Sequence, residues 1–319
     1  SLFNLGRFYS ANNTIYHDLK KAIECFKKSA KLGVSDAWYS IGHIYEKHIK
    51  NYEEAIKYYK LCADQGNPSA LYKLGNIFEK GDYVEGDIKT AIQYYEQASK
   101  LGNSKAMCKL GSIYENGQHI PINIDKAIHY YEDASKLNNA YAQFNLGMIY
   151  YDKKYNKFDI QKAIQFLNLA AKNNHTNAQY VLGTIYERSD YIANDIYKAI
   201  AYYKRAADEG NHRNSQNNLG KIYYNGIGGI SRNVNEALKY FQLAAKNKCP
   251  NAIYHLGKIY EEGKHGISKN ITKALDCFKQ AAKLNENNAQ YHLGKIYKEG
   301  TYNLYNINLA IDFLTRSAN

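Results

Sequence analysis

The sequence is poor in proline, which occurs only at Pro68, Pro121 and Pro250 among 319 residues. Because proline interrupts helices, this scarcity leaves room for many uninterrupted ones. Long apolar runs are missing as well: no stretch approaches the roughly 18 apolar residues that a membrane-spanning helix needs. We therefore expect a helical protein with no membrane span.

Cysteine is scarce and shows no pairing pattern. The five cysteines are Cys25, Cys62, Cys108, Cys249 and Cys277. Their number is odd, they are widely scattered and no CxxC occurs, which argues against a disulfide framework or a zinc site. A reducing compartment such as the cytoplasm is the expected location.

Motifs of catalysis are absent too. The ten histidines form no HExxH, and no GxSxG occurs. The glycine-rich stretch 225–230 follows an expected helix rather than a strand, unlike a dinucleotide-binding turn. His255 and His292 lie in equivalent sequence contexts, but no carboxylate or cysteine ligand shares their register, which favours surface histidines over a shared metal. The sequence predicts no enzyme, no cofactor and no metal.

The charge is positive and uneven. Lys and Arg number 42 against 30 Asp and Glu, a formal net charge of +12. From Ser215 to Asn319 the chain holds 14 basic and 7 acidic residues, so this third is the basic end. An excess of this kind favours acidic partners or nucleic acid. An AT-rich genome, whose codons favour Lys, Asn, Ile and Tyr, would also produce it.

A Leu-Gly pair, once Ile-Gly, recurs nine times. Its glycines are Gly6, Gly42, Gly75, Gly111, Gly147, Gly183, Gly220, Gly257 and Gly294. Steps of 33 to 37 residues mark stacked units that cannot bury their apolar faces alone. A small residue four positions before each Leu or Ile, and an aromatic three after each Gly, share one helical face, and the Gly admits close approach of a neighbouring helix. This pattern predicts the first helix of each unit.

A second series of alanines follows each pair after a variable loop. Its members are Ala22, Ala55, Ala91, Ala127, Ala163, Ala199, Ala237, Ala274 and Ala310. Bulky pairs three and four residues later, such as Tyr130-Tyr131, give a second apolar face. Glycine after this helix, at Gly66, Gly102 and Gly210, is expected to supply a left-handed stop. Each unit is thus a pair of helices, and no strand is expected.

The segment 106–114, with Leu110-Gly111 and Tyr114, followed by Lys126-Ala127 and Tyr130-Tyr131, resembles the Sel-one-like repeat, a subfamily of the tetratricopeptide-like solenoids. The resemblance covers the whole chain. It implies an all-α fold, a right-handed superhelical α/α solenoid of about nine helical hairpins. Residues 1–319 would form one such array, with incomplete or uncapped first and last repeats. It also implies that the first helices line a concave surface and that the protein acts as an adaptor or scaffold.

Two residues before each Leu or Ile runs a ladder of mostly aromatic groups. It comprises Phe3, Tyr39, Tyr72, Cys108, Phe144, Tyr180, Asn217, Tyr254 and Tyr291. Tyrosine offers a large contact area at low entropic cost, which suits recognition. The alternative is that these rings pack between repeats. Tyr39, Tyr72, Phe144, Tyr180, Tyr254 and Tyr291 are the candidate partner-binding members.

Polar rows accompany the ladder in the later repeats. Asparagines precede the Leu by five positions at Asn177, Asn214, Asn251 and Asn288, and lysines follow it by two at Lys221, Lys258 and Lys295. Asparagine can bond the backbone of an extended peptide, and lysine attracts carboxylates or phosphates. A solvated face in a Lys- and Asn-rich chain is the alternative. Lys73, Lys105 and Lys109 also stand where some tetratricopeptide proteins clamp a carboxylate, although Tyr72 and His43 replace the expected partners.

The sequence therefore predicts a non-catalytic scaffold that binds a protein or peptide of acidic character. RNA binding is the alternative, because tyrosine can stack on bases while lysine neutralises phosphates. Terminal repeats usually need a polar cap. We accordingly expect apolar faces near Phe3, Leu5, Phe313 and Leu314 to be covered by further sequence, a partner or another copy in end-to-end association.

Overall fold

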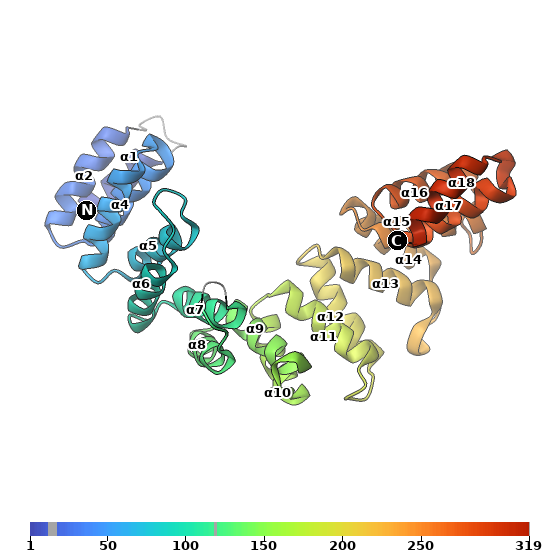
Figure 1. Ribbon diagram of the computed structural model, residues 1–319, viewed down its shortest axis with the longest axis horizontal. Coiled ribbons are helices and arrows are strands. Elements are labelled where there is room, and N and C mark those ends of the chain that lie inside the picture. The colour runs from blue at the N-terminus through green and yellow to red at the C-terminus, as the bar shows by residue number, and fades with distance from the viewer. Residues whose placement is uncertain (12–17, 118–119, 319) are drawn as a thin grey trace. The chain divides into compact units, whose positions relative to one another are not determined.

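The computed structural model describes residues 1–11, 18–117 and 120–318, and within them it contains helices and no strands. Eighteen α-helices follow one another as nine hairpins, two for every repeat (Figure 1). The chain divides into two compact units, residues 1–173 with five hairpins and 174–319 with four. The all-α repeat fold predicted from the Leu-Gly and alanine series is confirmed.

In residues 1–173 the first helices of the hairpins are α1 (Leu2–Ser10), α3 (Asp36–Ile44), α5 (Pro68–Lys80), α7 (Ser104–Asn116) and α9 (Ala140–Tyr151). The second helices are α2 (Leu19–Lys31), α4 (Tyr52–Asp64), α6 (Ile88–Lys100), α8 (Ile124–Lys136) and α10 (Ile160–Lys172). Short helical turns follow α3 and α9, a π turn η1 (Tyr45–Ile49) and a 3-10 turn η2 (Lys153–Tyr155).

In residues 174–319 the first helices are α11 (Thr176–Arg188), α13 (Arg213–Asn225), α15 (Pro250–Glu262) and α17 (Asn287–Glu299). The second helices are α12 (Ile196–Asp208), α14 (Val234–Lys246), α16 (Ile271–Lys283) and α18 (Ile307–Ala318). Two 3-10 turns, η3 (Ile227–Gly229) and η4 (Thr301–Asn303), follow α13 and α17.

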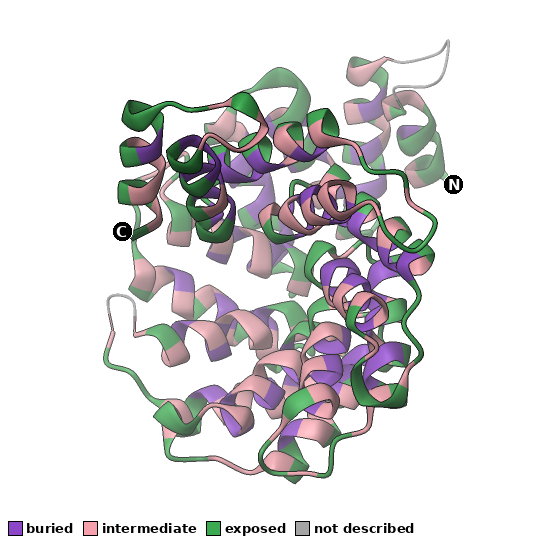
Figure 2. Ribbon diagram, turned by 90° about the vertical axis from the view of Figure 1, so that its right-hand side faces the viewer, coloured by how far each residue is buried: buried purple, intermediate pink, exposed green. Residues whose placement is uncertain are grey.

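The glycine of each Leu-Gly pair is a packing contact for the second helix of its own hairpin. A methyl group placed on Gly111 would lie 2.6 Å from ring carbons of Tyr131, and the same holds for Gly183 against Tyr203. Three residues after the glycine, Tyr114 stacks on Tyr130 with ring centroids 5.8 Å apart. Burial follows this pattern, since the buried residues lie where helices face each other (Figure 2). The expected close approach at glycine is confirmed.

The left-handed stops after the second helices are only partly as predicted. Gly66 and Gly102 have φ of 74° and 80°, whereas Gly210 does not adopt a positive φ and the neighbouring Asn211 does, at 49°. The prediction for Gly210 is therefore wrong. This glycine is required for another reason, because a side chain there would collide with Thr176 of α11.

The N-cap of a first helix also bonds the preceding repeat. The Asn103 side chain accepts the Ala106 amide hydrogen at 3.0 Å through its oxygen, and donates through its nitrogen to the Pro68 carbonyl of α5 at 3.0 Å. Asn139 repeats the arrangement on Ala142 and Ser104. One amide side chain therefore starts a helix and joins two hairpins.

Asn103→Ala is expected to cost about 2 kcal/mol, because a lost cap costs about 1 kcal/mol and a lost hydrogen bond about as much again. Asn123→Ala is the matched control. Asn123 caps α8 through the Lys126 amide and makes no side-chain bond to another repeat in the described part of the chain, so about 1 kcal/mol is expected. Denaturant unfolding of both variants gives the comparison, and equal losses would contradict the inter-repeat role.

The exposed apolar residues at the two ends of the array are mostly not those that the sequence predicted. Phe3 packs on Phe26 at 5.5 Å between centroids, Phe313 stacks on Tyr297 at 5.9 Å and Leu314 lies against Gly294. Of the four predicted residues, Leu5 is the exposed one, at 42 %. The other exposed apolar residues of α1 and α18 are Leu2, Phe8, Ile307, Leu309 and Ile311. The assignment is corrected for Phe3, Phe313 and Leu314, and end-to-end association stays a prediction.

Candidate functional site

The predicted asparagine row lies on the first helices of residues 174–319. Asn177, Asn214, Asn251 and Asn288 stand in α11, α13, α15 and α17, one in each, and all four are exposed. Each is the second residue of its helix, just after the N-cap, so equivalent positions of the hairpin carry the same amide. The Asn288 nitrogen donates to Glu286 at 2.8 Å. The row is thus a set of solvent-facing amides.

The predicted lysine row is less uniform. Lys221 is half-buried and forms no ion pair within the described part of the chain. Lys258 binds Glu261 at 2.7 Å, and Lys295 lies 3.8 Å from Glu299 with both groups about half exposed. Lys258 already has the half-buried Glu261 carboxylate as its partner, so it is a poorer candidate for a binding residue than the sequence prediction made it. Lys221 and Lys295 remain available.

The aromatic ladder is half-buried because its rings lie against the second helices. Tyr39 packs on Tyr59, Tyr72 on Tyr95, Tyr180 on Tyr203 and Tyr254 on Phe278, with ring centroids 5.3 to 6.0 Å apart. Phe144 is half-buried as well. Tyr291 differs, with 54 % of its surface exposed. Packing therefore accounts for much of the ladder, and Tyr291 is the member that presents most of its ring to a partner.

Asn217 occupies the ladder position of α13 but is 5 % exposed, and its side-chain oxygen has no hydrogen-bond partner within the structure. Asparagine here replaces the aromatic ring of the neighbouring repeats. The ladder is therefore interrupted between Tyr180 and Tyr254.

A set of carboxylates on the first helices, or in the π turn η1 that follows α3, was missed from the sequence. Four residues after the glycine of the Leu-Gly pair, a glutamate accepts the hydroxyl hydrogen of the tyrosine that packs on that glycine. The pairs are Glu46 with Tyr59 at 2.7 Å, Glu79 with Tyr95 at 2.6 Å, Glu115 with Tyr131 at 2.8 Å and Glu187 with Tyr203 at 2.6 Å. The signal was present, because every repeat with Tyr four residues after the second alanine carries this Glu, although Glu261 occurs with Phe278 instead.

The next repeat completes several of these pairs. Lys73 of α5 reaches back to Glu46 at 2.8 Å, and Lys109 of α7 reaches Glu79 at 3.0 Å. These two lysines belong to the suspected carboxylate clamp, so their charge is already matched within the fold. Lys105, the third, is exposed and makes no ion pair among the residues described.

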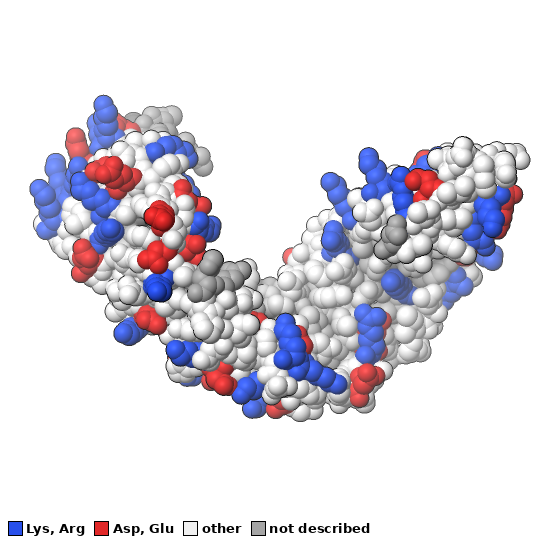
Figure 3. All heavy atoms as spheres, viewed as in Figure 1, with Lys and Arg blue, Asp and Glu red and all other residues white. Residues whose placement is uncertain are grey.

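Two of the glutamates are strongly acidic. Burial alone would raise the pKa of Glu46, but hydrogen bonds from Lys73, Lys47 and Tyr59 outweigh it and lower the pKa to about 2. Burial would likewise raise the pKa of Glu261, whereas His292 and Lys258 lower it to about 2. Both carboxylates are ionised at neutral pH and screen the lysines beside them. At the surface, Figure 3 shows acidic and basic groups interspersed over much of the visible face.

The histidines and cysteines do not gather into a site. His292 binds Glu261 at 2.9 Å, and His255 stacks on Phe241 at 4.9 Å, where burial lowers its pKa to about 4. In the described residues no group of three or more His, Cys, Asp or Glu is arranged to hold a metal, and the five cysteines are free. The helices described there include none that is long and apolar enough to cross a bilayer.

Successive helical hairpins repeat the same contacts, and within each of the two units the second helix of a hairpin packs on the first helix of the next, which defines a helical-repeat protein of the α/α solenoid class. The chain belongs to the Sel1 repeat family. Matches to the Sel1 repeat cover residues 1–34, 68–103, 104–139, 140–175, 176–211, 213–249, 250–286 and 287–319. Residues 35–64 match a tetratricopeptide repeat instead. That repeat is the short one, in which α3 passes into the π turn η1.

Solved structures with the same fold include a protective antigen of uropathogenic Escherichia coli, 23 % identical, with a TM-score of 0.83 over 99 % of this chain and 68 % of that one. A Sel1 repeat protein from Oxalobacter formigenes is 24 % identical, with a TM-score of 0.72 over 93 % of this chain and 86 % of that one. No curated protein matched the sequence. These similarities show the fold, which in this family generally serves as a scaffold for protein interactions.

Proposed function

We propose that the chain is a non-catalytic adaptor that binds an acidic, extended segment of another protein across the first helices of residues 174–319. The observation that carries the proposal is the exposed asparagine row, Asn177, Asn214, Asn251 and Asn288. Each amide offers a donor and an acceptor at the same place in successive repeats. An extended backbone presents the complementary groups at regular intervals.

Lysines give this face its preference for acidic partners. Lys221 and Lys295 flank Lys258 on neighbouring first helices, and Glu261 neutralises only the middle one. Tyr291 adds an exposed ring in the same helix as Lys295. The segment from Ser215 onward, with 14 basic and 7 acidic residues, also accounts for more than half of the formal net charge of +12. Amides would set the register of the bound segment, and the two lysines would speed its association.

RNA is the second candidate from the sequence, and this arrangement favours it less. Stacking on bases needs ring faces open to the ligand, whereas Tyr180 and Tyr254 lie against second-helix aromatics. We therefore expect a peptide to bind in preference to RNA, and the binding experiment below distinguishes the two.

Lys221→Glu combined with Lys295→Glu is expected to weaken binding of a labelled (Glu-Ala)8 peptide more than tenfold at low salt. Each lost attraction between exposed groups is worth about 0.2–1 kcal/mol, and each reversal adds a repulsion of similar size. The effect should shrink as salt rises, because exposed charges are screened. Fluorescence anisotropy across a salt series measures both quantities.

The matched control reverses two exposed lysines of the second helices, Lys239→Glu with Lys279→Glu, which gives the same net charge on a different face. This protein should bind the peptide nearly as the parent does. Equal loss in both double variants would mean that net charge alone attracts the peptide. Tighter binding of a labelled single-stranded RNA than of the peptide, lost with the Lys221 and Lys295 changes, would replace the proposal by RNA binding.

A further inference from the structure

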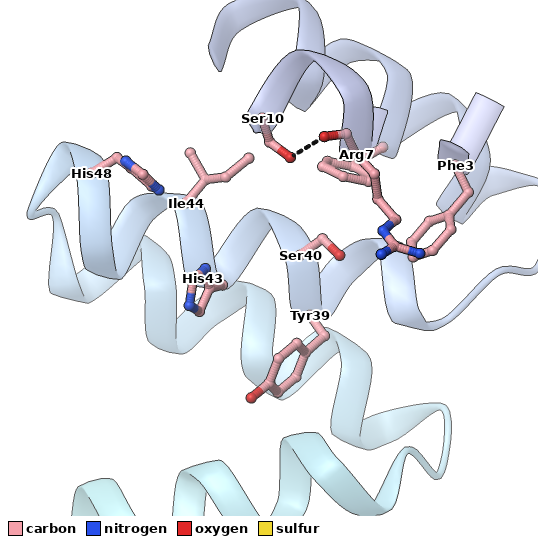
Figure 4. A pocket seen from close by; sticks show the side chains of 9 residues that line it. Phe3, Arg7, Ser10, Tyr39, Ser40, His43, Ile44 and His48 are labelled. Atoms are coloured by element: carbon pink, nitrogen blue, oxygen red, sulfur yellow. Dashed lines mark hydrogen bonds between the residues drawn. The ribbon is translucent and has the colours of Figure 1, made fainter. Parts of the chain in front are cut away.

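A hollow of about 330 Å³ lies between the first helices of the first two repeats. Its wall comprises Phe3, Arg7 and Ser10 of α1, Phe26 of α2, Tyr39, Ser40, His43 and Ile44 of α3, and His48 of η1. Figure 4 shows the Arg7 side chain reaching down beside the Phe3 ring and facing Ser40 across the hollow. The size is at the small end of the range for ligand pockets, which suits a single residue rather than a folded motif.

The charged group in the wall is the guanidinium of Arg7. Arg7 makes no ion pair within residues 1–11, 18–117 and 120–318, and no Asp or Glu is among the residues of the wall. The Ser10 hydroxyl donates to the Arg7 carbonyl at 3.0 Å, and the Ser40 hydroxyl donates to the Asp36 carbonyl at 2.9 Å. Both hydroxyl hydrogens are therefore engaged, and the guanidinium is the charged donor that faces the cavity.

The His43 imidazole of the wall does not add to this charge at neutral pH. Burial lowers the pKa of His43, which favours its neutral form. The nearby carboxylate Glu46 already pairs with Lys47 and Lys73 and accepts the hydroxyl hydrogen of Tyr59. It therefore does not pair with Arg7. A ligand in the hollow thus meets one fixed positive charge, whose planar fork matches the two oxygens of a carboxylate.

Another part of the wall is apolar. Phe26 is 1 % exposed and Ile44 is 3 % exposed, and Phe3 completes this side with its ring. An internal Asp or Glu would bring a carboxylate but no apolar side chain on the same residue. The last residue of a polypeptide carries both on one Cα, a carboxylate and an apolar side chain, when that residue is Leu, Ile, Phe or Val.

We infer that this hollow binds the apolar C-terminal residue of a partner polypeptide, with its carboxylate on Arg7 and its side chain against Phe3, Phe26 and Ile44. The site lies in residues 1–173, so the inference goes beyond the proposed function of residues 174–319 and does not depend on it. Tyr39 also lines a second hollow, together with Tyr72 of α5 and Lys105 of α7. The residues preceding the bound terminus would pass over Tyr39 into this adjoining space.

The test uses the whole chain and labelled peptides of sequence Ser-Gly-Ser-Gly-Ser-Leu with either a free carboxylate or a C-terminal amide. Fluorescence anisotropy should show at least tenfold tighter binding of the free carboxylate. Arg7→Gln should abolish this difference while leaving the weak binding of the amide unchanged. Arg7 is exposed and has no ion pair, so loss of the fold is not expected, and circular dichroism checks it.

Lys20→Glu, at an exposed lysine on α2, is the matched control and should preserve the preference for the free carboxylate. Phe3→Ala should weaken the Leu-ended peptide several-fold and leave a Ser-ended one unchanged, which tests the apolar wall separately. Equal binding of carboxylate and amide, or an Arg7→Gln protein that keeps the preference, would overturn the inference. An amidated peptide ending in Glu that binds as well as the free Leu carboxylate would overturn it in favour of an acidic side chain.

Discussion

Gly111→Ala is expected to lower the free energy of unfolding by about 2 kcal/mol. In an exposed helix the same change would raise it by about 1 kcal/mol, because alanine has the higher helix propensity. Here the new methyl group would lie 2.6 Å from two ring carbons of Tyr131, a fully buried side chain. Overpacking of this kind costs about 1–3 kcal/mol or more. Because neither helix can move aside easily, we expect a cost in the upper part of that range. This cost exceeds the gain in helix propensity.

A double-mutant cycle identifies the ring as the cause. Tyr131→Ala alone should cost about 3–5 kcal/mol, as expected for a large aromatic removed from a core. Once the ring is gone, Gly111→Ala should cost nothing or stabilise, so the two changes are expected to be strongly non-additive. Urea unfolding of the four proteins measures the coupling. Additive losses would show that Gly111 is needed for some reason other than the tyrosine.

Glu46→Ala is expected to cost about 3 kcal/mol. The carboxylate is 2 % exposed and accepts hydrogen bonds from Tyr59 at 2.7 Å and from Lys73 at 2.9 Å. Removing one partner of a buried charged pair costs about 3–5 kcal/mol, and the lower value applies because the lysine reaches solvent. Glu54→Ala is the matched control. Glu54 pairs with Lys57 at the surface, so its loss should cost less than about 1 kcal/mol.

The dependence on pH follows from the low pKa of Glu46, about 2. A glutamate in an unfolded chain has a pKa of about 4.3, so the folded state binds this proton less readily than the unfolded state. The stabilisation by Glu46 is complete above the unfolded value and is lost as the pH falls from there toward about 2. The difference in unfolding free energy between the parent and Glu46→Ala should therefore narrow over this window. A difference that stays constant down to the lowest pH would contradict the assignment.

Much of the fold could be predicted from one sequence because each hairpin repeats the same contacts. The positions of Gly111, Tyr114 and Tyr130 within a repeat indicate two helices, and the structure places the three residues in one interface. The asparagine row could be predicted in the same way, since residues such as Asn214 and Asn251 occupy one register of successive helices. Periodicity transfers directly into spatial equivalence in a repeat fold.

Contacts between residues at different positions of the repeat could not be predicted in this way. Lys258 shares a register with Lys221 and Lys295, yet Glu261 on the following turn and His292 in the next repeat change its surroundings. The site at Arg7 was missed for a related reason. Arg7 shares the register of these three lysines, but the five repeats between it and them have no Lys or Arg at this position, and the cavity depends on side chains from three helices.

The hydrogen bond between the second-helix tyrosine and the first-helix glutamate bears on how such a chain tolerates change. Tyr131 and Glu115 form the pair within one hairpin, whereas repeats with Leu167 or Phe241 at the tyrosine position carry Tyr151 or Tyr224 in place of the glutamate. A hairpin duplicated or exchanged as a whole keeps both halves of its pair. A recombination joint inside the loop between the two helices separates them, and when it combines a Tyr–Glu hairpin with one of the other type it leaves a phenol or a carboxylate without its partner. For this pair the unit of exchange is therefore the hairpin, and chimeras joined between hairpins should fold more often than those that mix the two types within one hairpin.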